Sequence, residues 1–122
     1  MTTINDLAQS CDDEGGLLAT TLGELRDAVG AGKLGRLVMD RIARELASHG
    51  LGYFPQEVLE DNEQPRHWED IRLYRKGTSA AARAIEAVMD PSPHGDAFLI
   101  ELASSDAEEK LQRVREIVAT DR

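Results

Sequence analysis

The feature that most constrains this fold is a helical repeat of apolar residues between residues 33 and 49, which Gly50 ends. The repeat predicts one long helix with a buried face. Its apolar residues are Leu34, Leu37, Val38, Ile42 and Leu46, with Met39 and Ala43 beside them. A helix with one apolar face needs other elements to cover that face, so the core must form around this segment.

A shorter helix is predicted just before the long one. Thr21 is a typical helix N-cap, and Glu24 three residues later completes a capping box for a helix from Leu22 to Val29. The run Gly30-Ala31-Gly32 ends that helix and allows a tight turn. Two helices joined by a tight turn are therefore predicted, and residues 2–10 can form a further short helix.

Three segments have strand character. Residues 17–20 form a short apolar run, residues 51–55 are closed by a proline, and residues 70–75 alternate polar and apolar side chains. Residues 56–69 are polar and predict a loop or a hairpin tip. Whether residues 51–55 and 70–75 pair with each other is left open.

The last third of the chain is predicted to be mostly helical. One helix spans residues 78–89, with Thr78 or Ser79 as its N-cap. Residues 97–103 fit a strand or a helix, and their helical face favours the helix. A final helix, opened by Ser105, extends to about residue 119.

Length and composition predict a single domain of 122 residues. A chain of this length buries roughly two thirds of the surface that its unfolded form exposes. Because only 4% of its residues are aromatic, the core must be aliphatic. The domain is expected to comprise a helix and acidic link (1–16), a central core (17–76) and a C-terminal helical extension (77–122). The predicted fold class is therefore mostly α with a small β-hairpin.

The lone cysteine, Cys11, indicates a reducing compartment because a single thiol forms no intramolecular disulfide. The N-terminus lacks the basic start and apolar run of a secretory signal. No stretch approaches the ~20 apolar residues that cross a bilayer. A cytoplasmic location without a membrane partner is therefore expected.

No pattern typical of an enzyme is found, so no catalytic residue, cofactor or metal is expected. Cys11 falls in a segment expected to be flexible and acidic, which raises the pKa of a thiol. Residues 30–35 lack the P-loop spacing and do not follow a strand. The three histidines match no zinc-binding spacing. Trp68, beside His67, is expected to cover the edge of the core.

Charge is arranged in blocks along a chain whose formal net charge is −9. Acidic surfaces repel nucleic acid, so the average opposes DNA binding. Residues 26–44 and 66–85, however, each carry a net charge of +3, between three blocks of −5. The location of the two basic blocks in the fold therefore matters more than the average.

The order of elements in residues 17–76 resembles the winged helix-turn-helix superfamily. The segment that carries the resemblance runs from Thr20 through the Gly-Ala-Gly turn to a helix that ends near Gly50. The resemblance implies that residues 33–49 form a recognition helix whose N-terminal part enters the DNA major groove. It also implies that the two later strands form a wing against the DNA backbone, although residues 56–69 are long for a wing.

Both basic blocks fall on the elements that would face DNA in such a fold. The resemblance therefore implies a non-enzymatic regulator of transcription that binds double-stranded DNA. Cationic side chains there would neutralise phosphates, and arginines would also read guanine edges. The implied nucleic-acid-binding residues are Lys33, Arg36, Arg41, Arg44, Arg72, Arg75 and Lys76.

A protein partner is the alternative function. Arg41 with Glu45, and Asp40 with Arg44, are i,i+4 pairs that need no ligand. Winged-helix folds also act as protein–protein modules, such as antitoxin-like proteins, adaptors or acidic inhibitors. An acidic patch that would suit a basic partner or mimic nucleic acid consists of Glu57, Glu60, Asp61 and Glu63.

The final helix predicts a homodimer. Its apolar face consists of Leu111, Val114, Ile117 and Val118. Symmetric pairing of such helices often forms dimers, and a dimer would suit a protein that binds two DNA half-sites. Packing of this face on residues 78–89 of the same chain is the alternative.

Overall fold

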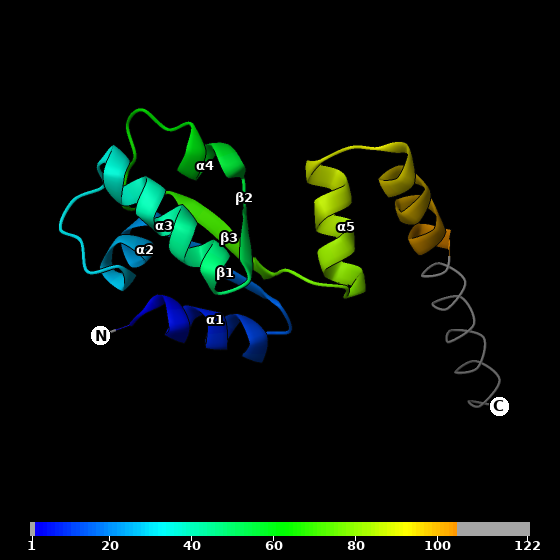
Figure 1. Ribbon diagram of the computed structural model, residues 1–122, viewed down its shortest axis with the longest axis horizontal. Coiled ribbons are helices and arrows are strands. Elements are labelled where there is room, and N and C mark those ends of the chain that lie inside the picture. The colour runs from blue at the N-terminus through cyan, green and yellow to red at the C-terminus, as the bar shows by residue number, and fades with distance from the viewer. Residues whose placement is uncertain (1, 105–122) are drawn as a thin grey trace, which may run out of the picture. The chain divides into compact units, whose positions relative to one another are not determined.

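A computed structural model describes residues 2–104 of the chain. The chain divides into two compact units between residues 82 and 83, of which residues 2–82 and 83–104 are described. In chain order the elements are α1 (Ile4–Asp13), β1 (Leu17–Thr21), α2 (Leu22–Ala28), α3 (Arg36–Ser48), β2 (Leu51–Phe54), α4 (Gln56–Glu60), β3 (Asp70–Arg75) and α5 (Ala80–Met89), and residues 93–104 are helical (Figure 1). The predicted class, mostly α with a small β-hairpin, is confirmed, and a third strand enlarges the hairpin to a small antiparallel sheet.

The sheet has three antiparallel strands in the order β1-β3-β2. In the β2–β3 pair, Leu51 lies opposite Arg75 and Phe54 opposite Arg72. The two segments whose pairing the sequence left open therefore form one hairpin. β1 adds to the other side of β3, with Leu17 opposite Tyr74, so the short apolar run is a strand.

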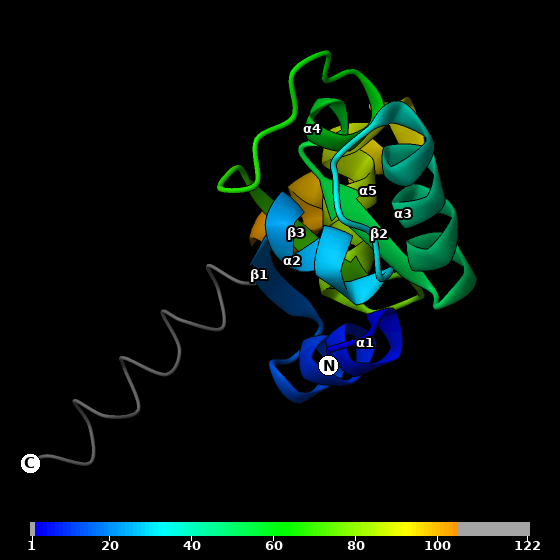
Figure 2. The ribbon, with the colours of Figure 1, turned by 90° about the vertical axis from the view of Figure 1, so that its left-hand side faces the viewer.

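The core of the first unit lies between the sheet and helices α1, α2 and α3 (Figures 1 and 2). On β3, Ile71 and Leu73 are buried in this core, so strand alternation places Arg72 and Tyr74 on the opposite face of the sheet. The core is aliphatic, as predicted, and the helices contribute Ile4, Leu7, Ala8, Cys11, Leu22, Leu25, Ala28, Met39, Ile42 and Leu46.

Helix α1 is longer than predicted because its apolar face continues past Ser10. Cys11 is fully buried and extends the series begun by Ile4 and Leu7. The helix begins with a reciprocal capping box, in which the Thr3 and Asp6 side chains accept hydrogen bonds from each other's backbone N–H groups. The first half of the acidic segment 11–16, expected to be an exposed link, is therefore helical, and only residues 14–16 form a turn.

The N-cap of α2 is confirmed, but the predicted capping box is only half present. The Thr21 side chain accepts a hydrogen bond from the Glu24 backbone N–H at 3.2 Å. The Glu24 carboxylate, however, accepts a hydrogen bond from the Thr20 hydroxyl. Because Thr20 is buried, its hydroxyl needs an acceptor, and Glu24 supplies one.

The predicted start of the long helix at Lys33 is wrong, since α3 begins at Arg36 with Gly35 as its N-cap. Glycines at positions 32 and 35 make a helical conformation costly there. Leu37 was predicted to face the core, but its side chain is 83% exposed. At 3.6 residues per turn, Leu37 lies roughly 160° around the helix from Met39, which is buried.

Residues 56–69 are not all loop, because α4 forms there and buries Leu59. The prediction that Trp68 covers the edge of the core is wrong, since Trp68 is 63% exposed. The loop backbone meets α2 instead. The carbonyl of His67 accepts a hydrogen bond from the N–H of Gly23 at 2.9 Å.

The two helices predicted after the sheet are present, although α5 begins two residues later than predicted and the next helix already begins at residue 93. The Ser79 hydroxyl accepts a hydrogen bond from the Ala82 N–H at 3.1 Å, which fits a cap for α5. Residues 97–103 are helical, as favoured, and the Arg83 guanidinium lies 4.1 Å from the Phe98 ring centroid. The predicted dimer face of Leu111, Val114, Ile117 and Val118 lies outside the described residues, so the homodimer stays a prediction.

Candidate nucleic-acid interface

The outer side of α3 carries three exposed arginines, Arg36, Arg41 and Arg44. They face outward because Met39, Ile42 and Leu46 occupy the inner side of the helix. Figure 2 shows no other helix or strand of the first unit on the outer side of α3. The arginine-bearing face is therefore open to solvent within that unit.

These arginines differ in how they are engaged. Arg41 donates to Glu45 at 3.2 Å, the i,i+4 pair that the sequence predicted. Arg36 and Arg44 form no ion pair with any residue from 2 to 104. The alternative pairing of Asp40 with Arg44 is thus not formed, and two of the three guanidinium groups are available to a ligand.

The structure brings together cations from the two basic blocks. Arg44 and Lys76 line the same hollow of about 330 Å³ between α3 and β2, together with Tyr53. Lys76 is held there by its backbone N–H, which donates to the Gly50 carbonyl at 2.9 Å. We call this the basic hollow, although Glu60 also contributes to its lining. Tyr53 donates to Glu60 at 2.7 Å.

The opposite end of α3 has the reverse electrostatic character. A hollow of about 400 Å³ lies between the start of α3 and the segment after α4. Arg36 contributes to its lining, but four carboxylate side chains line it too: Asp40, Glu60, Asp61 and Glu63. This acidic hollow contains three of the four residues of the predicted acidic patch. An anionic ligand should therefore approach the outer side of α3, which carries Leu37 and Arg44 and does not line this hollow.

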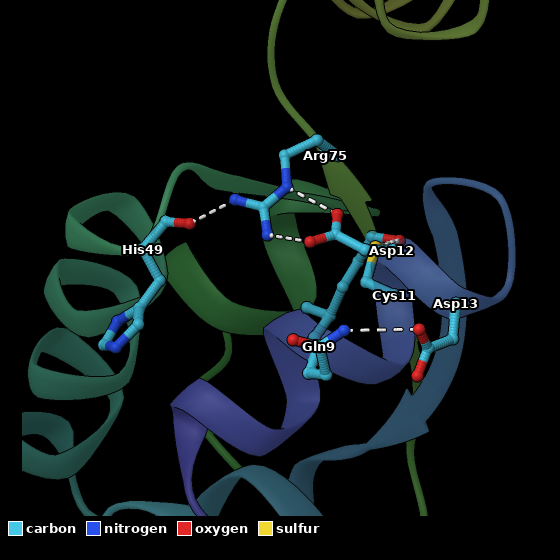
Figure 3. Close-up of polar contacts among 7 residues, drawn as sticks. Gln9, Cys11, Asp12, Asp13, His49 and Arg75 are labelled. Carbon is cyan, nitrogen blue, oxygen red and sulfur yellow. Dashed lines mark hydrogen bonds and ion pairs between the residues drawn. The ribbon is translucent and has the colours of Figure 1, made fainter.

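Arg75, predicted to bind nucleic acid, is engaged inside the fold (Figure 3). Its Nε and Nη2 atoms donate to the two carboxylate oxygens of Asp12 at 2.8 and 2.9 Å, and its Nη1 donates to the His49 carbonyl. The hydrogen bonds to Arg75 hold the pKa of Asp12 below its usual range. Arg75 thus joins α1, β3 and the end of α3, and it does not belong to the interface.

The remaining predicted residues do not join the α3 face. Arg72 lies on the side of the sheet opposite to Ile71 and Leu73, and therefore opposite to α3. Lys33 is exposed in the turn between α2 and α3, three residues before the helix begins. The interface therefore consists of Arg36, Arg41, Arg44 and Lys76.

Leu37 also belongs to this surface, although the apolar pattern of the sequence predicted it in the core. At 3.6 residues per turn, Leu37 and Arg44 lie about 20° apart around the helix, almost on one line. That line points away from Ile42 and Leu46, which are fully buried. The apolar pattern placed Leu37 and Met39 on one face, which is wrong because they lie on nearly opposite sides of α3.

Cys11, the one cysteine of the chain, is not exposed for chemistry at the surface. Cys11 is buried, its thiol donates to the Leu73 carbonyl at 3.8 Å, and burial raises its pKa. Within residues 2–104 there is no group of three or more His, Cys, Asp or Glu side chains that could hold a metal ion.

The helices of the described part are also too short or too polar for a membrane span.

Comparisons of the chain with protein-family models, with curated proteins and with solved structures give no match. The function of the α3 surface must therefore be inferred from its own geometry and chemistry.

Proposed function

We propose that this chain is a non-enzymatic regulatory protein that binds double-stranded DNA through the outer face of α3. The observation that carries the proposal is a pair of cations at the basic hollow, Arg44 and Lys76, which form no ion pair with any residue from 2 to 104. They come from different basic blocks of an acidic chain. Two cations that line one hollow suit a phosphate backbone, because each neutralised phosphate releases counterions.

The order of the elements supports this proposal. A helix pair joined by a turn is followed by an antiparallel hairpin, and β1 completes the sheet. These are the elements that the resemblance to winged helix-turn-helix proteins implies. In such proteins the second helix of the pair lies in the major groove, and here that helix is α3.

The test is the binding of a fluorescent random-sequence duplex at ~50 mM salt, where proteins with several phosphate contacts bind strongly, followed by a salt series. We expect the full chain to bind and the double variant Arg36→Ala, Arg44→Ala to bind at least tenfold more weakly. The salt slope should become shallower by about one for each phosphate that the variant no longer neutralises.

The matched control is the double variant Arg26→Ala, Arg83→Ala. It changes the net charge by the same amount but leaves α3 intact, since Arg26 pairs with Asp27 and Arg83 contacts Phe98. The control should bind like the unmodified chain. Absence of binding by the unmodified chain, or equal weakening in both variants, would contradict binding through α3.

A protein partner is the second candidate function, and the acidic hollow favours it. Its four carboxylates lie beside α3 and suit a lysine- or arginine-rich segment of another protein. Such binding should weaken with salt and with the double variant Asp61→Asn, Glu63→Gln. Retention of a co-purified basic partner by this variant would argue against the acidic hollow as its site.

A further inference from the structure

We infer that Leu37 determines sequence specificity by contacting thymine methyl groups in the major groove. The inference rests on the proposed binding of DNA through α3. It starts from the position of a leucine that is 83% exposed in the first turn of that helix. Isolated exposed leucines are common on protein surfaces, so the case depends on the surroundings of this one.

Those surroundings place Leu37 on the same face of α3 as the arginines of the proposed interface. Arg41 lies one turn after it, and Arg44 lies two turns after it on almost the same line. A DNA duplex that contacts these arginines must therefore also meet the leucine. Because the N-terminal part of such a helix lies deepest in the groove, Leu37 is placed against base edges and the two arginines nearer the backbone.

The chemistry of the groove then limits what Leu37 can contact. Three of the four bases present only donors or acceptors at the major-groove edge, whereas thymine also presents its C5 methyl group. A leucine side chain has no hydrogen-bonding atom. Against the other bases it would remove water from polar edges without replacing the hydrogen bonds, so thymine is the favourable contact.

The experiment uses thymine and uracil, which differ only in this methyl group. Duplexes enriched by the full chain from a random 20-bp pool are prepared a second time with deoxyuridine in place of thymidine. We expect the unmodified chain to prefer the thymidine form by about fourfold for each methyl group that Leu37 touches. The Leu37→Ala variant should bind both forms equally, with the affinity of the unmodified chain for the deoxyuridine form.

Two controls separate this inference from the proposed function. Leu17→Ala removes an exposed leucine from β1, away from α3, and should keep the thymidine preference. Arg44→Ala should weaken binding to both forms by the same factor. Equal binding of both forms by the unmodified chain, or a preference that persists in Leu37→Ala, would overturn the role of Leu37 while DNA binding stands. Failure of the unmodified chain to enrich any duplex would overturn both.

Discussion

The most sharply defined packing contact in the sheet is that between Gly52 and Tyr74, which lie opposite each other in the β2–β3 pair. The Tyr74 ring is 2% exposed and covers Gly52. A Cβ atom at position 52 would lie 2.2 Å from Cζ and 2.4 Å from Cε1 of that ring. Carbon atoms normally approach to about 3.5–4.0 Å, so Gly52→Ala requires the ring to move by more than 1 Å.

Either response of the ring is costly. Overpacking with the ring in place costs about 1–3 kcal/mol, and moving the ring into solvent gives up about 1.5–3 kcal/mol of burial. Alanine recovers about 0.5–1 kcal/mol over glycine in a strand. We therefore expect a net destabilisation of about 1–2 kcal/mol, or a fall in Tm of roughly 4–16 °C for a unit of this size.

The decisive measurement is urea unfolding, followed by circular dichroism, in two backgrounds. In a Tyr74→Val chain the ring is absent but a β-branched residue keeps the strand propensity. There, Gly52→Ala should be neutral or stabilising, so the double-mutant cycle should give a coupling of at least about 1 kcal/mol. The same destabilisation in both backgrounds would refute the steric explanation and assign the effect to the β2 backbone.

Two further predictions concern the contacts between α1 and the sheet. Because Arg75 lowers the pKa of Asp12, the stabilisation from this pair is present above the unfolded pKa of about 4 and is lost as pH falls through the lower folded pKa. The difference in urea midpoint between the unmodified chain and Asp12→Asn should be constant from about pH 5 to 7 and should disappear below pH 4. A difference that persists at pH 2 would contradict the ion pair. Since Cys11 is fully buried and its pKa is raised, a thiol reagent should label the folded chain only as fast as the chain unfolds. Labelling at equal rates with and without urea would show that Cys11 is accessible in the folded state.

The elements that the sequence predicted well are those specified by neighbouring residues. The N-cap at Thr21, the helical period that ends near Gly50, and the alternation of residues 70–75 all act within one or two turns of chain. Each of these features appears in the structure close to the predicted position. Local patterns also favoured a helix over residues 97–103, which the structure contains.

The errors arise where distant residues decide the structure. The carbonyl of His67 accepts a hydrogen bond from the N–H of Gly23, 44 positions away in the chain. The loop backbone therefore covers α2, and the Trp68 side chain does not. Arg75 is engaged inside the fold because Asp12, 63 positions away in the chain, accepts its hydrogen bonds. A count of charge along the chain treats Arg44 and Arg75 alike. In the described part of the chain, however, Arg44 forms no ion pair, whereas Arg75 joins three elements. Only the fold separates the two roles.

The difference between paired and unpaired cations limits how DNA can be bound. The sequence assigned seven cations to the interface, but the described structure leaves three unpaired on or beside the outer face of α3: Arg36, Arg44 and Lys76. Three phosphate contacts correspond to a slope of about −3 in a plot of log K against log salt, which is shallow for a DNA-binding protein. Electrostatic attraction from this face is therefore weak, and a sequence-specific complex needs non-ionic contacts, of which Leu37 is the best placed. A measured slope much steeper than −3 would mean that cations outside this face, or a second copy of the chain, also contact the backbone.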